Sequence, residues 1–354
     1  MKSIIRILAV VVVLSALTSQ SAYAGNDERR GTAGGSELLI NPWARNTGWG
    51  GVNVANVRGL SSMFSNVAGL AFVDGIEVGY SNTMLYGGKS GLSSGASINA
   101  FGFAVRIFER GVAGAYVMAM GFGEIDRTMY DSPEGGNGTF SPSYMNINVA
   151  YAHSFTNTIH GSVLFKVVTE STDNVSCSGL GIDAGIQYVT GEDDELKFGI
   201  ALKNWGPSMK FGGTGLSLQM VNTAGNNFTV ETRAAEMELP TCLNIGLSYD
   251  FLIEKWDQRI TLAAAFTSNA FLRDNYTVGL EYSLLNMFQL RCGYIMQPGL
   301  WSNPATANNG LCAGASVNVP LAKDDSKTGV TIDYSFQSAS PMRGTHSIGA
   351  SLRF

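Results

Sequence analysis

The chain has 354 residues and a formal net charge of −5, a balance that gives no reason to expect a nucleic-acid partner. Charged residues make up 14% of the chain, against about 25% in ordinary soluble domains, and glycine is enriched at 43 residues. After the first residues no apolar run is long enough to cross a membrane as a helix, which excludes a helical membrane protein.

The first residues predict a secretory signal peptide over 1–24. Lys2 and Arg6 give a positive start, an apolar stretch covers 7–17, and the segment ends in Ala-Tyr-Ala. The alternative is a retained anchor helix, but no stop-transfer pattern follows. We therefore expect an exported mature chain.

A polar lead over 25–35 is expected to be flexible, and it precedes an unusual segment, 36–72. This is the only long stretch after the N-terminus that does not alternate apolar and polar residues. It contains two tryptophans, two arginines and three closely spaced glycines. We expect it to fill the interior of a barrel as a plug. Its candidate site residues are Trp43, Arg45, Trp49, Arg58 and Asn66.

The rest of the chain, 73–354, predicts an all-β fold, a 14-stranded antiparallel transmembrane β-barrel. Apolar and polar residues alternate over about ten positions in several stretches. This is the length that a tilted strand needs to cross a bilayer. A soluble sandwich is the alternative. The predicted strands lie at 75–83, 97–109, 112–123, 143–155, 159–170, 174–190, 195–204, 241–251, 259–268, 273–283, 286–296, 310–320, 328–336 and 345–354.

The lengths of the connections support the barrel independently. Short turns, such as 110–111 and 284–285, alternate with longer loops, such as 124–142. In bacterial outer-membrane barrels the short turns face the periplasm and the long loops face outward. The longest loop, 205–240, is expected to lack regular structure, and a loop of this length is usually functional or disordered.

Many of the residues assigned to the lumen have very small side chains. Because the interior of a barrel widens with strand number, such side chains cannot fill it and leave room for a plug. We expect the tryptophans and arginines of the plug to pack against these small residues. On two strands they are Ala113, Ala115, Ala119, Gly121, Gly123, Gly179, Gly181 and Gly185.

The lumenal parity also carries charges of both signs, which fit either structural ion pairs or a path for ions or solutes. Buried arginines need partners, so Arg45 and Arg58 are expected to face carboxylates such as Glu77, Asp183 or Glu281. The lumenal charges are Glu77, Arg106, Lys166, Glu170, Asp183, Lys197, Lys203, Asp250, Glu281, Arg291, Asp333 and Arg353.

Enzyme signals are weak. His153 and His346 fall on the lipid-facing parity, and His160 faces inward without a nucleophile or a fixed acid partner in the sequence. The four cysteines have no metal-type spacing: three share the lumenal parity, where a pair could form, and Cys292 faces lipid. We predict no catalytic residue, no metal and no cofactor. The lumenal cysteines are Cys177, Cys242 and Cys312.

Several motifs resemble one known family. The plug contains LLINPWAR (38–45), then WGG, then NVAGLA (66–71), and Asn-Trp-Gly-Pro at 204–207 is followed by Leu-Pro-Thr-Cys at 239–242. Together they are similar to the PorV/PorQ family of Bacteroidetes outer-membrane proteins, which is related to FadL-type barrels. The chain departs from the family pattern where Asn66-Val67-Ala68-Gly69 replaces Asn-Pro-Ala-Gly.

The resemblance implies a non-enzymatic subunit of a protein export or assembly complex of the type IX secretion kind, in the outer membrane of a Gram-negative, Bacteroidetes-like bacterium. Its partners would be the lipid bilayer and other outer-membrane or surface proteins. One alternative is a FadL-like channel for hydrophobic small molecules, and another is an accessory barrel in barrel-assembly or surface-lipoprotein machinery. The apolar residues expected to hold a partner on the longest loop are Trp205, Phe211, Leu216, Leu218, Met220, Val221 and Phe228.

Overall fold

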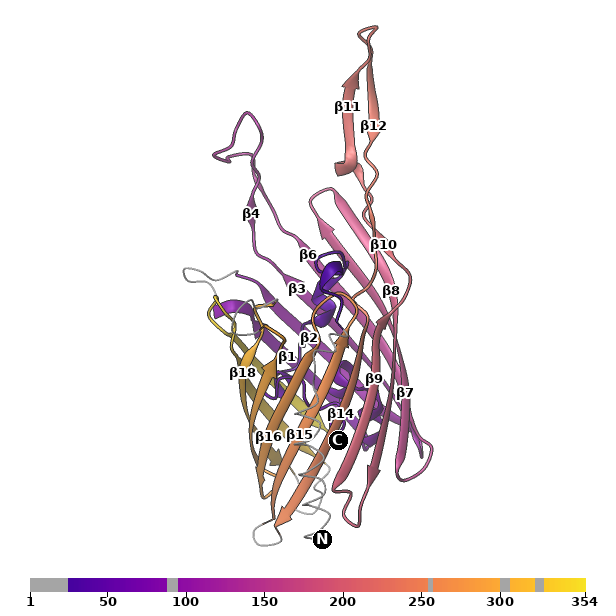
Figure 1. Cartoon of the computed structure of the whole chain (residues 1–354), viewed down its shortest axis with the longest axis vertical. Coiled ribbons are helices and arrows are strands. Elements are labelled where there is room, and N and C mark those ends of the chain that lie inside the picture. The colour runs from indigo at the N-terminus through magenta and orange to yellow at the C-terminus, as the bar shows by residue number, and fades with distance from the viewer. Residues whose placement is uncertain (1–24, 88–94, 254–256, 300–305, 322–327) are drawn as a thin grey trace.

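The computed structural model contains one closed barrel of fourteen antiparallel strands (Figure 1), so the predicted fold class is confirmed. The first strand, β1, pairs with β2 on one side and with the last strand, β20, on the other. Phe354 completes the closure, since its carbonyl accepts the N–H of Ile76 at 3.0 Å. The predicted signal peptide lies outside the described residues, which are 25–87, 95–253, 257–299, 306–321 and 328–354.

Each predicted strand is present, with ends that differ from the prediction by no more than two residues. The barrel strands are β1 Ile76–Met84, β2 Ser97–Phe108, β3 Gly111–Gly121, β6 Ser143–Ser154, β7 Ile159–Thr172, β8 Val175–Thr190, β9 Leu196–Trp205, β14 Cys242–Ile253, β15 Gln258–Asn269, β16 Asn275–Leu284, β17 Phe288–Met296, β18 Gly310–Pro320, β19 Gly329–Gln337 and β20 Thr345–Arg353.

Shorter elements lie between and before these strands. The helical turns are η1 Asp27–Arg29, η2 Ser36–Leu39, α2 Ala44–Thr47, α3 Ser62–Ser65, η3 Val67–Phe72, η4 Leu85–Gly87 and η5 Thr214–Leu216. The short strands are β4 Ile125–Asp126, β5 Thr139–Phe140, β10 Met209–Lys210, β11 Ser217–Val221, β12 Asn227–Glu231 and β13 Glu236–Met237. No helix in the described part of the chain is long and apolar enough to span a membrane.

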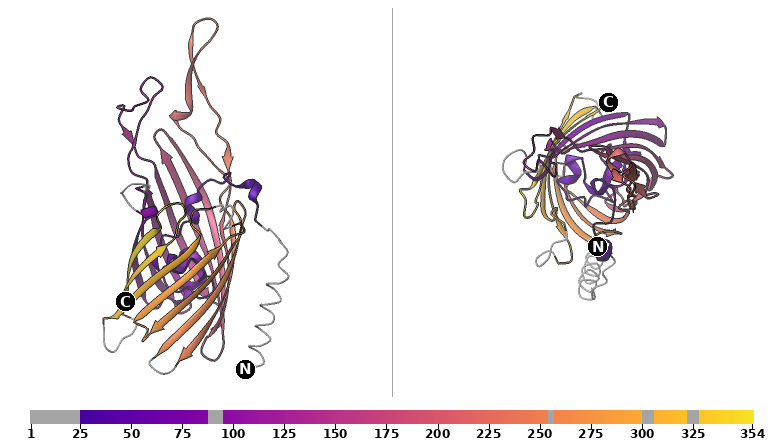
Figure 2. Two further views of the ribbon diagram at one scale, coloured as in Figure 1. Left: turned by 60° about the vertical axis from the view of Figure 1, so that its left-hand side comes forward. Right: turned by 90° about the horizontal axis from the view of Figure 1, so that it is seen from above.

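The two ends of the barrel differ. At the inner end, the connections include the short turns 109–110 and 285–287. At the outer end, the connections 122–142 and 206–241 extend far beyond the barrel (Figures 1 and 2). The prediction of an irregular 205–240 loop is wrong, because β11 and β12 pair into a hairpin, as do β10 and β13 at its base.

The outward face of the barrel is apolar. Phe101, Phe165, Leu180, Leu290 and Ile332 come from five different strands, and their exposed fractions are 55–60%. Along each of these strands the alternate residues are mainly buried in the interior. An apolar outer band over a partly polar interior is the pattern of a membrane β-barrel.

The interior has an apolar half and a polar half. A large apolar core joins residues 36–73 to the lumenal faces of β2, β3, β6, β7 and β8. Burying each large side chain of this core, such as Leu60, Met63 or Leu70, contributes about 1.5–3 kcal/mol. On β9 and on β14–β20 the buried lumenal positions are largely polar or charged, including Asp250, Glu281 and Arg291.

The predicted parity of β3 is wrong. Ala113, Ala115, Ala119 and Gly121 lie on the outward-facing side of the strand, and Gly123 lies beyond its end. The lumenal residues are instead Val112, Gly114, Tyr116, Met118 and Met120. The prediction placed apolar residues toward lipid, but here the lumen contains its own apolar core, so both faces of this strand are apolar.

Candidate functional site: the lumenal segment and its two cavities

Residues 36–72, which we call the lumenal segment, lie inside the ring of strands, as the view down the barrel shows (Figure 2). The preceding residues 25–35, expected to be a flexible lead, are not a free tail. The N–H of Gly34 donates to the carbonyl of Glu238 at 2.9 Å, and the Arg29 guanidinium lies 4.2 Å from the centre of the Phe271 ring.

The backbone of the lumenal segment approaches the barrel wall closely where the wall has glycine. A Cβ atom at Gly293 would lie 2.5 Å from the carbonyl oxygen of Trp49. A Cβ at Gly199 would overlap the carbonyl of Val54. Glycine at these lumenal positions therefore allows main chain to pack directly on the strands.

The two tryptophans are both buried, but in different surroundings. Trp43 makes an edge-on contact with Tyr116, with ring centroids 5.9 Å apart, and belongs to the apolar core. Trp49 packs against Val52 and faces Gly279 and Gly293 on the polar half of the barrel. The expected contact of tryptophan with small lumenal residues therefore exists, but not at Gly179 or Gly181. Gly179 lies against Met209 and Leu239, and Gly181 lies against Lys166 and Leu239.

Asn66 ties the end of the segment to the wall. Its Oδ1 accepts the N–H of Ala68 at 3.1 Å, and its Nδ2 donates to the carbonyls of Val54 at 2.9 Å and Ile186 at 3.1 Å. Gln187 adds a donor from β8 to the carbonyl of Val57 at 3.1 Å. These bonds satisfy buried polar groups that would otherwise be costly to bury.

The expected ion pairs of the two plug arginines are not formed. Arg45 donates to Gln289 Oε1 at 2.9 Å, and Arg58 lies 4.4 Å from the centre of the Phe72 ring. Neither needs a carboxylate, because Arg45 is only partly buried and the Arg58 side chain faces open space.

Two of the three predicted carboxylate partners, Asp183 and Glu281, bind other cations instead. Asp183 pairs with Lys166 at 2.7 Å and also accepts the N–H of Asn204 at 2.6 Å. Glu281 pairs with Arg291 at 2.6 Å. These pairs are formed between barrel strands, so they depend on the wall and not on the lumenal segment.

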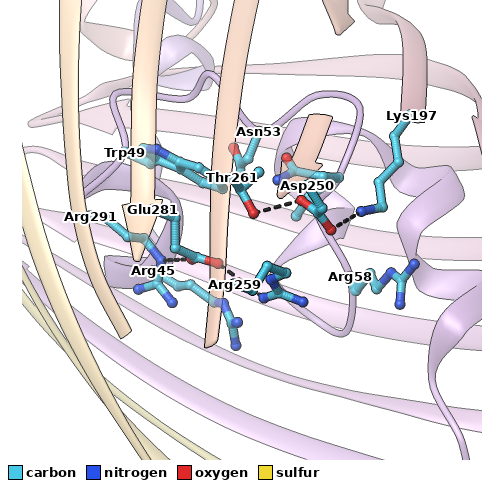
Figure 3. A pocket seen from close by; sticks show the side chains of 12 residues that line it. Arg45, Trp49, Asn53, Arg58, Lys197, Asp250, Arg259, Thr261, Glu281 and Arg291 are labelled. Carbon is cyan, nitrogen blue, oxygen red and sulfur yellow. Dashed lines mark hydrogen bonds and ion pairs between the residues drawn. The ribbon is translucent and has the colours of Figure 1, made fainter. Parts of the chain in front are cut away.

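A polar cavity of about 80 Å³, which we call the inner cavity, lies between the lumenal segment and the inner ends of β9, β14, β15, β16 and β17 (Figure 3). Arg259 is part of it and was missed in the sequence, although it shares the lumenal parity of Thr261. The lining residues are Arg45, Trp49, Asn53, Asn56, Val57, Arg58, Lys197, Asp250, Arg259, Thr261, Glu281 and Arg291.

A larger cavity of about 410 Å³, the outer cavity, lies on the outer side of the lumenal segment. Its lining is mainly neutral, with apolar side chains such as Ile40 and Ile295 among amides and hydroxyls such as Asn244 and Thr267. Lys203 also lines it, with Nζ 3.6 Å from the centre of the Phe64 ring. Sequence analysis missed this cavity, although amides are concentrated at the outer ends of β14–β16.

The two cavities are separated by one turn of the lumenal segment. Thr47, Gly50 and Gly51 line the outer cavity, whereas Trp49, between them in sequence, lines the inner cavity. Gly50 and Gly51 both have a positive φ, of 65° and 73°, which permits this tight turn. At this turn, residues that are neighbours in sequence therefore line different cavities.

The residues expected to hold a partner divide into three groups. Trp205 belongs to the barrel wall as the last residue of β9, and Phe211 is partly buried against the apolar core, which corrects its assignment to an exposed loop. Leu216 is half-buried in η5. Four residues do lie exposed on the outer hairpin: Leu218, Met220, Val221 and Phe228.

In the described residues, no group of three or more His, Cys, Asp or Glu side chains could hold a metal ion. His160 packs on Phe72, with centroids 4.3 Å apart, and its Nδ1 contacts Ser154 Oγ at 2.9 Å. All four cysteines are free thiols, with Cys292 exposed and the other three buried.

Comparison with known proteins shows a shared fold. No protein-family model and no curated protein sequence matches the chain. The monoaromatic hydrocarbon channel CymD matches with a TM-score of 0.55 and 15% identity over 89% of this chain and 98% of its own. The Pseudomonas putida toluene transporter TodX matches with a TM-score of 0.51 and 13% identity over 84% and 94%.

A Pseudomonas aeruginosa FadL homologue also matches, with a TM-score of 0.47 and 12% identity over 94% and 99% of the two chains. At such identities the likeness to CymD and TodX concerns the fold. Neither the PorV/PorQ assignment nor a link to type IX secretion finds support among these matches.

Proposed function

We propose that this protein is a channel for small hydrophobic molecules in the outer membrane of a Gram-negative bacterium. The observation that carries the proposal is the outer cavity of about 410 Å³, a volume within the range of small-molecule sites. Its mostly neutral lining suits an apolar or weakly polar solute better than an ion.

Two further observations support the proposal. CymD and TodX, which share this fold, are a monoaromatic hydrocarbon channel and a toluene transporter. They favour a channel, the alternative in the sequence analysis, over the export subunit placed first there, and a non-enzymatic role fits both. The apolar outer band of the barrel supports the membrane location.

In this proposal the lumenal segment is the plug, and the turn at Trp49, Gly50 and Gly51 lies between the two cavities. A solute would enter the outer cavity and be held above this turn. Passage would then require the turn to move, because the wall of the barrel is a continuous ladder of hydrogen-bonded strands.

Filling the outer cavity tests the proposal. Thr267→Trp adds bulk at a lumenal position of β15 that lines the cavity, whereas Ser268→Trp adds the same bulk one residue further, on the outward face. We expect Thr267→Trp to slow uptake of radiolabelled toluene by bacterial cells several-fold and Ser268→Trp to leave it unchanged. Equal uptake by Thr267→Trp and wild type would contradict a solute path through this cavity.

A second candidate function, a subunit of an export or assembly complex, is favoured by the outer hairpin alone. Leu218 pairs with Val230, and Met220 pairs with Phe228. Because these positions are two apart on each strand, their side chains share one face. An isolated two-stranded hairpin is marginal in water, so this apolar face would gain from cover by a partner protein.

A further inference from the structure

The inner cavity has an excess of positive charge that the channel function does not explain. Five cationic side chains line it: Arg45, Arg58, Lys197, Arg259 and Arg291. Only two carboxylates do so, Asp250 and Glu281. The cations come from the lumenal segment and from three different strands, so the fold, and not one local sequence, brings them together.

Both carboxylates already have close partners. Asp250 forms an ion pair with Lys197 and accepts a hydrogen bond from Thr261 Oγ1 at 2.6 Å. Glu281 accepts from Arg291 Nε at 2.6 Å and from Arg259 Nη2 at 3.2 Å. Lys197 and Arg291 are thereby neutralised within the wall of the cavity.

Three guanidinium groups remain with unused donors. Arg45 has one hydrogen bond, to Gln289, and Arg58 has only the Phe72 ring as its partner among the described residues. Arg259 keeps a side-chain exposure of 31%, and its Nε has no hydrogen-bond partner within the described part of the chain. Figure 3 shows the guanidinium groups of Arg45 and Arg259 near each other and that of Arg58 further along the cavity, on the side of Lys197.

Three other acidic groups lie near these arginines: Asp194, Glu77 and Asp333. Glu77 and Asp333 lie across a smaller neighbouring cavity of about 30 Å³ that Arg45 and Arg58 also line. Asp333 accepts a hydrogen bond from Ser316 and lies 3.8 Å from Arg291 Nη1. The Glu77 carboxylate lies against Gly59, where a Cβ atom would be 2.6 Å from its Oε2.

We propose that the inner cavity binds a small oxyanion, a carboxylate or a phosphate, between Arg45, Arg58 and Arg259. A planar guanidinium with free N–H groups matches these anions in a bidentate geometry. A volume of about 80 Å³ is two to three times the share of one water in the liquid, which suits an anion of this size. The site is independent of hydrophobic transport.

Titration of the purified full-length protein in mild detergent tests the site. Inorganic phosphate and acetate are titrated separately by calorimetry at low, constant ionic strength, so that the two arms distinguish a phosphate from a carboxylate ligand. We expect saturable binding of at least one anion, and a loss of at least tenfold in affinity in Arg58→Gln. Within the described residues Arg58 contacts the Phe72 ring and makes no hydrogen bond or ion pair, so this variant should fold like the wild type.

Arg110→Gln is the matched control, because Arg110 is an exposed arginine at the same end of the barrel, in the turn between β2 and β3, and outside the cavity. It should bind the anion as the wild type does. The proposal is overturned if neither anion gives saturable binding, if Arg58→Gln binds like the wild type, or if Arg110→Gln weakens binding as much as Arg58→Gln does.

Discussion

The Oδ1 atom of Asn66 occupies the space that a Cβ atom at Gly185 would fill. The side chain of Asn66 is thereby held against β8, where its amide also donates to the carbonyl of Ile186. This contact joins the lumenal segment to the barrel wall at β8. It predicts that the two residues are energetically coupled.

We expect Gly185→Ala to destabilise the folded barrel, because the new methyl group displaces Asn66 and its hydrogen bonds. Asn66→Ala should cost about 1–3 kcal/mol by leaving buried carbonyls without their donor. In the double variant the added Cβ meets no amide, so the two costs should not add. The temperature of the heat-modifiable shift in gel migration measures this, and simple additivity would argue against the contact.

The buried triad of Lys166, Asp183 and Asn204 gives a second prediction. Lys166 Nζ lies 2.7 Å from both Asp183 Oδ2 and Asn204 Oδ1, and the first two side chains are 3% exposed. Lys166→Met leaves a buried carboxylate without its cation, which should cost about 3–5 kcal/mol.

Adding Asp183→Asn should restore most of the stability that Lys166→Met loses, because the lone charge is removed while Oδ1 can still accept the N–H of Asn204. The same gel-shift temperature compares the single and double variants. A double variant less stable than Lys166→Met would show that charge burial is not the dominant cost here.

The strands could be predicted because alternation with period two is local and survives in every barrel strand. Which residues of β3 face the lumen and which face outward could not be predicted. A rule that places apolar residues toward lipid assumes a polar lumen, and Met63 and Leu70 of the lumenal segment make the lumen apolar at this strand. Tyr116 and Met118 can be assigned to the lumen only when that core is known.

The candidate site was harder to predict than the fold. Residues Trp49 and Arg58 stand out in the sequence by type, but their partners Gly279 and Phe72 depend on how the segment folds back inside the barrel. The arginine prediction failed because it assumed full burial, whereas Arg58 faces an open cavity. The sequence shows which residue types are present. A cavity, in contrast, forms only when distant segments of the chain come together in the folded barrel.

The partition between the two cavities gives a third prediction. Trp49→Ala should join them and raise the single-channel conductance in planar bilayers, since Trp49 lines the inner cavity and its neighbour Gly50 lines the outer one. Trp43→Ala is the control, because Trp43 is equally buried but belongs to the apolar core. Each truncation should cost about 3–5 kcal/mol, so an equal rise in both variants would indicate general loosening and not an opened partition.

The last prediction concerns the outer hairpin and separates a partner-binding role from a channel role. Leu218, Met220 and Phe228 are 58%, 50% and 44% exposed and lie on one face of β11 and β12. Covering apolar surface is worth about 25 cal/mol per Å² before the costs of association. If a partner protein covers this face, replacing all three residues with serine should release it from the complex purified in mild detergent.

The matched control replaces Gln219 and Thr229, which form a cross-strand pair on the opposite face of the same hairpin, with alanine. Its partners should remain bound, since the apolar face is intact. Toluene uptake by the triple serine variant should stay at the wild-type rate, because the hairpin lies beyond the outer cavity and does not line it. Loss of uptake with unchanged partners would instead make the hairpin part of the solute path.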